Sequence, residues 1–166
     1  MAVPQDFSIF CATEYPRLVR ALSLYCGSRD AAEDAAQEAL VRACERWSSV
    51  ATMTSPGGWV FRVATNQLRT RYRRVGMAAR VLASAPHDVD VPDADEMIVV
   101  RQAVARLPRR QRQALVLRHT FALNVDETAD LMGVSSTAVR SLTHRAISTL
   151  RAELIPGDVE TNTGGE

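Results

Sequence analysis

Arginine and aromatic side chains are interleaved in WVFRVATNQLRTRYRR, a predicted helix that Ser55 and Pro56 should start. Guanidinium groups can track the phosphates of a nucleic acid, and rings such as Trp59 and Tyr72 can stack on its bases. The alternative is a plain core face with merely solvated arginines; its core residues would be Trp59, Val60, Val63 and Leu68. We favour DNA, because uncompensated arginines repel one another without an anionic partner; these are Arg62, Arg69, Arg71, Arg73, Arg74 and Arg80.

A second polar surface is expected on a helix that runs from about residue 136 to Arg151. Small hydroxyl groups at its N-terminal end, followed by arginines one turn later, suit a helix whose first turns enter the major groove. The outward-facing residues are Ser136, Thr137, Arg140, Ser141, His144 and Arg145. From spacing alone, a solvated surface or a protein contact explains this pattern as well as DNA does.

Capping residues place that helix in a helix-turn-helix. Asn124 and Glu127 form a capping-box pattern, so a short helix should begin near Val125. Gly133 can end it in the left-handed conformation, and Ser135 can cap the next helix. A helix, a short turn with glycine and a second helix make up this motif. The second helix carries an apolar packing stripe of Val139, Leu142, Ala146 and Leu150.

Two further helices, over 94–106 and 108–121, are predicted before the helix-turn-helix. Their apolar positions should form the core on which the recognition helix packs; they are Val100, Val104, Leu107, Leu115, Leu117 and Phe121. Their arginines are candidates for phosphate contacts, namely Arg109, Arg110, Arg112 and Arg118.

The N-terminal half predicts helices over residues 5–26 and about 30–47. Pro16 should kink or divide the first helix, and Gly27 should end it. Asp30 with Glu33 resembles a capping box for the second helix. Positions i, i+3 and i+4 share a helical face, which turns three polar residues outward together: Asp34, Gln37 and Glu38. A solvated stripe is the plain explanation of this triplet.

Charge is distributed in blocks along the 166 residues, although the formal net charge is only +1. All 20 basic residues are arginine, and they lie in two blocks with an acidic segment between them and an acidic tail after them. This arrangement fits two nucleic-acid-binding modules on a tether. We therefore predict an all-α protein with two small helical domains at 5–75 and 96–152, a flexible linker at 76–95 and a disordered tail at 153–166.

Composition and motifs argue against several other classes of protein. Hydrophobic residues are 46% and charged residues 23%, as in an ordinary globular chain. No apolar run reaches the length of a membrane span and no signal peptide is visible, so we expect a cytoplasmic protein without membrane insertion. Cys11, Cys26 and Cys44 lack zinc-like spacing and should be reduced core thiols; a redox switch has little support. With no catalytic constellation or ligand cluster, we expect neither an enzyme nor a cofactor or metal site.

The run from Leu107 to Arg151 resembles the fourth conserved region of bacterial sigma factors of the sigma-70 family, in particular the small extracytoplasmic-function (ECF) group. The matching elements are Leu107-Pro108, Gln111-Arg112, Leu115 to Arg118, Glu127 to Ala129, Met132 to Ser135, Val139 to Ser141 and Arg145-Ala146. The segment AEDAAQEAL resembles the DxxQE core of the second region of this group. The arginine-rich helix is similar to the next ECF pattern at Trp59, Asn66 and Arg73.

The resemblance implies a sigma factor whose partners are core RNA polymerase, through its beta-prime and beta subunits, and promoter DNA. Asp34, Gln37 and Glu38 would dock on the beta-prime coiled coil through charge-assisted bonds. The loop before Ser55 and the start of the next helix would capture an unstacked base of the opened promoter. The minus-ten element would be bound by Trp59, Arg62, Asn66, Arg69, Arg71, Arg73 and Arg74. The minus-thirty-five element would be bound by Arg118, Ser136, Thr137, Arg140, Ser141, His144 and Arg145. An anti-sigma factor is a further implied partner.

Two positions depart from the ECF pattern. Thr70 stands where the family commonly has Asp, which bears on the sequence recognised at the minus-ten element, and Leu142 stands where it often has Arg. The alternative function is a stand-alone helix-turn-helix regulator that binds duplex DNA as a dimer. Such a regulator needs neither a polymerase-docking face nor a single-strand platform, so the N-terminal half discriminates between the two functions.

Overall fold

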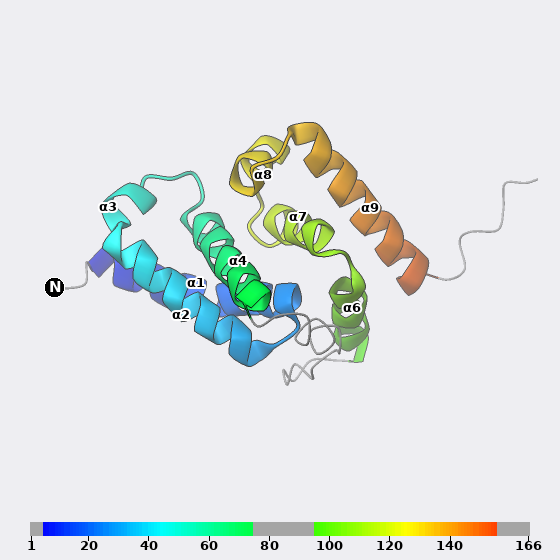
Figure 1. The fold of residues 1–166 in the computed structure, drawn as a ribbon, viewed down its shortest axis with the longest axis horizontal. Coiled ribbons are helices and arrows are strands. Elements are labelled where there is room, and N and C mark those ends of the chain that lie inside the picture. Colours follow the sequence, from blue (N-terminus) through cyan, green and yellow to red (C-terminus); the bar gives the residue numbers. More distant parts are fainter. Residues whose placement is uncertain (1–4, 75–94, 156–166) are drawn as a thin grey trace, which may run out of the picture.

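The computed structural model describes residues 5–74 and 95–155, which form eight helices and no strand (Figure 1). The prediction of an all-α chain is confirmed. The expected linker and tail, together with Arg80, lie almost entirely outside the described residues.

The first two helices meet at a glycine turn. α1 (Gln5–Cys26) continues through Pro16, so this proline does not divide it; Pro16 is exposed, where water can satisfy the freed helical carbonyl. Gly27 has a φ of 75° and ends α1. Ser28 then caps α2 (Arg29–Glu45) by accepting a hydrogen bond from the Ala31 N–H at 3.3 Å. The predicted cap at Asp30 is therefore wrong, because the chain already has the extended backbone of an N-cap at Ser28.

α2 packs through a face of very small side chains. Five alanines on this face are at most 2% exposed: Ala32, Ala35, Ala36, Ala39 and Ala43. Small side chains let α1 and α4 (Pro56–Arg74) approach α2 closely, and both helices pack on it. Between α2 and α4 lies the short α3 (Trp47–Val50), whose Trp47 ring packs on Phe7 and Phe10. The predicted start of α4 is confirmed, since the Ser55 hydroxyl accepts from the Gly58 N–H at 3.1 Å.

The C-terminal half contains α6 (Asp95–Arg106), α7 (Arg109–His119), α8 (Val125–Met132) and α9 (Ser136–Leu154). The predicted capping box is confirmed, with Asn124 and Glu127 bonding each other's backbone N–H at 2.9 and 2.8 Å. Gly133 has a φ of 63°, and Ser135 caps α9 through the Ala138 N–H. α8, the glycine turn and α9 thus form the expected helix-turn-helix.

The apolar core runs from one half of the chain into the other. α1 contacts α6 and α7, and α4 contacts α8. Four residues after α6 belong to the same buried cluster as α1, α2 and α4; they are Val116, Leu117, Phe121 and Leu123. Val100, predicted as core, is 38% exposed, and so are its neighbours Ile98 and Val99 at 43% and 53%, so this turn of α6 lies at the surface of the described residues. Val104 and Leu107 are buried as predicted, and Leu115 only partly so.

Candidate polymerase and nucleic-acid interfaces

The outer face of α9 carries the polar residues that the sequence predicts there. Thr137, Arg140, Ser141, His144 and Arg145 are all exposed. Ser136 is half-buried, and its hydroxyl donates to the Asp126 carboxylate on α8. On the opposite side Val139 and Ala146 are fully buried, with Leu142 and Leu150 partly buried. α9 lies on the side of the molecule away from α1 and α2, which leaves this face open (Figure 1).

The arginines of α7 have four different surroundings. Arg112 is 9% exposed and donates to the backbone carbonyls of Tyr25, Ala105 and Leu107, and burial lowers the pKa of its guanidinium. Its predicted phosphate contact is therefore wrong, since its guanidinium is buried and both Nη atoms donate inside the protein. Half-buried Arg118 donates to the Leu123 carbonyl at 2.7 Å. Arg109 lies over the Tyr72 ring, and Arg110 is exposed.

α4 combines a core face with an arginine-rich face. Val60, Phe61, Ala64 and Leu68 are buried, whereas Arg62, Asn66, Arg69, Arg71 and Arg73 are exposed. Trp59 is half-buried against the core, and the side chain of Arg74 lies outside the described groups. α4 therefore has both an apolar core face and an exposed basic face. Thr70, where the ECF pattern has Asp, donates its hydroxyl to the Asn66 carbonyl at 3.0 Å.

The polar triplet of α2 is exposed and takes part in ion pairs within the protein. Asp34 lies 3.6 Å from Arg71 on α4, and Glu38 lies 3.0 Å from Arg42, while Gln37 is exposed between them. Pairs this exposed contribute at most about 1 kcal/mol each, so a partner can replace them at little cost.

Val41 was missed as a member of the same surface. Its side chain is 59% exposed, three residues after Glu38 and four after Gln37, and therefore on the same helical face. An apolar residue at this spacing was a usable signal in the sequence. Together, Asp34, Gln37, Glu38 and Val41 are called the α2 surface below.

All three cysteines lie within the described residues, and their thiols are free. Cys11, Cys26 and Cys44 are all half-buried. Burial raises the pKa of Cys11 and of Cys26, so both are protonated at neutral pH and weak nucleophiles. Among residues 5–74 and 95–155, no group of His, Cys, Asp and Glu could hold a metal ion. No helix of those residues is long and apolar enough to cross a membrane.

Comparison with known proteins links these surfaces to one family. Residues 11–76 match the family model for sigma-70 region 2, and residues 97–150 match the model for sigma-70 region 4. A relative named RNA polymerase sigma-E factor, from Streptomyces avermitilis, is 30% identical over 93% of this chain and 88% of its own. The chain belongs to the sigma-70 family, in its ECF group.

Two other similarities agree with this assignment. The ECF RNA polymerase sigma factor EcfG of Rhodopseudomonas palustris is 30% identical to this ECF sigma factor over 77% of the chain and 74% of its own. The solved structure of the sigma factor RpoE in complex with the anti-sigma factor NepR, from Bartonella quintana, matches in fold with a TM-score of 0.75. That match covers 91% of this chain and 98% of the other at 21% identity. From here on, α1 to α4 are called region 2, and α6 to α9 are called region 4.

Proposed function

We propose that this ECF sigma factor docks on core RNA polymerase through the α2 surface, binds the opened minus-ten element through α4, and reads the minus-thirty-five element through α9. It thereby directs the polymerase to specific promoters, acting by binding rather than by catalysis. The proposal is supported by one observation above all: α2, α4 and α9 each present an exposed polar face on a single molecule. A dimeric duplex-binding regulator would use only the last of these.

The α2 surface has the chemistry of a protein interface. Asp34, Glu38 and Gln37 offer oxygen acceptors to arginines of the polymerase beta-prime coiled coil, with the beta subunit as a further contact. Exposed Val41 lies among them, where desolvation of an apolar group adds to the polar contacts. The exposed pairs with Arg71 and Arg42 would exchange for pairs with the partner.

α9 can separate base reading from backbone binding. Arginine bonds bidentately to guanine or clamps a phosphate, and the two roles differ in their sensitivity to sequence and salt. We assign base reading to Arg140 and backbone binding to Arg145, with smaller contacts from Ser136, Thr137, Ser141 and His144. Arg118 would contribute only the N–H groups that Leu123 does not use.

α4 would bind single-stranded DNA electrostatically. Its exposed Arg62, Arg69, Arg71 and Arg73, with Arg74 and Asn66, would track the backbone and one base, while Trp59 lies at the end that follows the loop. Polymerase works on DNA in the cytoplasm, where we place this protein. An anti-sigma factor is a further partner that we propose on the resemblance alone.

The deciding experiment is transcription in vitro. Purified core polymerase is given genomic DNA with and without this protein, and the 5′ ends of the transcripts are sequenced. We expect new start sites that share two upstream elements. Specific duplex binding by the free protein, with no new start sites, would favour the stand-alone regulator.

A double substitution tests the α2 surface. Asp34→Arg with Gln37→Arg should abolish co-purification with core polymerase and the new transcripts, because arginines would then face arginines. Asp130→Arg with Ala152→Arg makes the same change in charge at exposed sites of region 4, and it should leave co-purification intact. Equal behaviour of the two double variants would show that the docking surface lies elsewhere.

A further inference from the structure

The two helices of the helix-turn-helix are joined by a hydrogen bond between side chains. The Ser136 hydroxyl, in the first turn of α9, donates to the Asp126 carboxylate, in the first turn of α8. The turn between the helices is fixed, because Gly133 has a φ of 63° and the Val134 N–H donates to the Ala129 carbonyl at 3.1 Å. The fold itself therefore holds this pair in place, without help from DNA.

Neighbouring residues of the same types have other partners. Glu127 follows Asp126, but its carboxylate accepts from the N-cap N–H of α8 at 2.8 Å and completes the capping box. Ser135 precedes Ser136, but its hydroxyl accepts from a first-turn N–H of α9 at 3.2 Å and caps that helix. Asp126 and Ser136 instead contact each other across the turn.

The direction of this hydrogen bond determines what Ser136 can offer to DNA. A hydroxyl has one proton to donate and two lone pairs that accept, whereas an ionised carboxylate only accepts. Because the proton of Ser136 points to Asp126, the Ser136 oxygen is left as an acceptor. The adjacent carboxylate adds a negative charge, which repels other oxygen acceptors and attracts amino groups. Asp126 is exposed and Ser136 is half-buried, so both reach the surface.

An acceptor at this place distinguishes two classes of base. In the major groove adenine N6 and cytosine N4 donate from their amino groups, whereas guanine O6 and thymine O4 accept. An acceptor in the first turn of a recognition helix therefore favours adenine and cytosine on the strand that it contacts. Arg140 lies one turn later on the same face of α9, and as a donor it has the opposite preference, for guanine.

We infer that Asp126 is a positioning residue for minus-thirty-five recognition, which fixes Ser136 as an acceptor for the amino group of an adenine or a cytosine. This role rests on the proposed function of α9 and names the class of base that its first turn reads. Asp126 acts through Ser136 and needs no contact with DNA. Because the hydroxyl is ordered when the protein folds, binding does not have to order it again.

The test is transcription in vitro from a pool of barcoded promoters with a randomised minus-thirty-five element. Core polymerase is combined with the unmodified protein or with a variant, and the transcripts are counted by barcode. With the unmodified protein we expect one position at which adenine or cytosine is favoured on one strand. Ser136→Ala removes the acceptor and should reduce this preference roughly three- to tenfold, the effect of one hydrogen bond.

Asp126→Asn should relax the preference at the same position and by a similar factor. An amide can donate to Ser136 as well as accept from it, so the hydroxyl would no longer be confined to accepting. The double variant should lose no more than either single variant, because both substitutions remove the same contact. Ser136→Thr keeps the hydroxyl and should keep the preference.

Asp130→Asn is the matched control. Asp130 is exposed one turn later on the same face of α8, so the substitution removes the same charge. It should leave the base preference unchanged at every position. Preferences that persist elsewhere in the element report that each variant is folded.

Other outcomes would overturn this role of Asp126. Equal base preferences for Asp126→Asn and Asp130→Asn would show that Asp126 contributes charge alone. Effects of Asp126→Asn and Ser136→Ala at different positions, or effects that add in the double variant, would show that the two residues act independently. Failure of the proposed function is seen separately, as absence of specific transcripts with the unmodified protein. The same variants would then select duplexes from a random pool without polymerase, where the pair predicts the same loss of preference.

Discussion

α4 and α9 are both nineteen-residue helices with an apolar stripe and an arginine-bearing face, yet the fold treats them differently. α9 packs on α6, α7 and α8 of its own region, and its polar face is open. α4 packs on α1 and α2, and region 4 then covers its first turn and the Tyr72 ring. Periodicity thus identifies the arginine face that each helix keeps exposed, but not that a second region packs on the first turn of α4.

The difference has a physical origin in the side chains at each contact. Gly57 and Gly58 leave the start of α4 without side chains, so the apolar loop of region 4 can reach its backbone. α9 has no such gap on its outer face, where exposed arginines and hydroxyls keep their hydration.

The largest expected effect comes from removing Arg112, whose hydrogen bonds join Tyr25 of region 2 to Ala105 and Leu107 of region 4. Arg112→Ala leaves the carbonyls of Tyr25, Ala105 and Leu107 without their donor, and we expect a loss of about 3 kcal/mol in the free energy of unfolding. Urea denaturation measures this effect.

Arg110→Ala is the matched control for this change. Arg110 is exposed on the same helix, so its loss should change the unfolding free energy by no more than about 0.5 kcal/mol. Equal urea midpoints for the two variants would mean that the buried Arg112 guanidinium contributes nothing to the free energy of unfolding.

An intermediate effect is expected on α9, where the face is open. Arg140→Ala should relax preference at one or two base pairs of the minus-thirty-five element, at a cost of about 1 to 3 kcal/mol. Arg145→Ala should weaken binding to all sequences and flatten its salt dependence. Transcription from promoter variants at two salt concentrations separates the two roles. Unaltered base preference with Arg140→Ala would remove this residue as the reader.

The smallest expected effect concerns Ala122, which lies between the buried residues Phe121 and Leu123. Ala122 has a φ of 53°, a left-handed conformation that glycine adopts more easily. Ala122→Gly should therefore stabilise the folded protein by about 0.5 kcal/mol. Ala12→Gly, at an exposed site within α1, should instead destabilise by about 0.5 to 1 kcal/mol. Thermal melting of both variants shows whether the signs differ, and equal signs would contradict the strain at Ala122.

Local chemistry made much of the fold predictable from the sequence. The capping box of Asn124 and Glu127, the left-handed Gly133 and the Ser55 cap depend on residues three or four positions apart, and all three occur as expected. The outward face of α9 follows from the same short spacing.

Contacts between distant segments were not predictable in this way. From the sequence, Arg112 is a candidate phosphate contact. Its partners in the structure are backbone carbonyls, which no residue type reveals, and one of them belongs to Tyr25 at the end of α1. The docking of Phe121 likewise depends on Arg17 and Gly57, which only the folded chain brings together. The prediction that Val100 is buried was wrong for a simpler reason, since a hydrophobic residue can stay on the surface.

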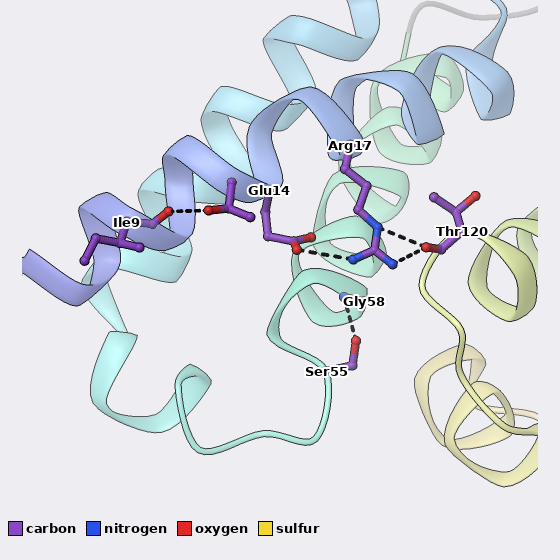
Figure 2. Close-up of polar contacts among 7 residues, drawn as sticks. Ile9, Glu14, Arg17, Ser55, Gly58 and Thr120 are labelled. Carbon is purple, nitrogen blue, oxygen red and sulfur yellow. Dashed lines mark hydrogen bonds and ion pairs between the residues drawn. The ribbon is translucent and has the colours of Figure 1, made fainter.

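The hydrogen bond between Arg17 and Thr120 (Figure 2) can form only late in the synthesis of the chain. Its two ends are 103 residues apart, and the acceptor is synthesised well after α4 is complete. Ribosomes add roughly 5 to 20 residues per second, and N-terminal units fold first. Every nascent chain therefore carries α1 to α4 for a time on the order of seconds before Phe121 and Leu123 can complete the apolar core that they share with those helices.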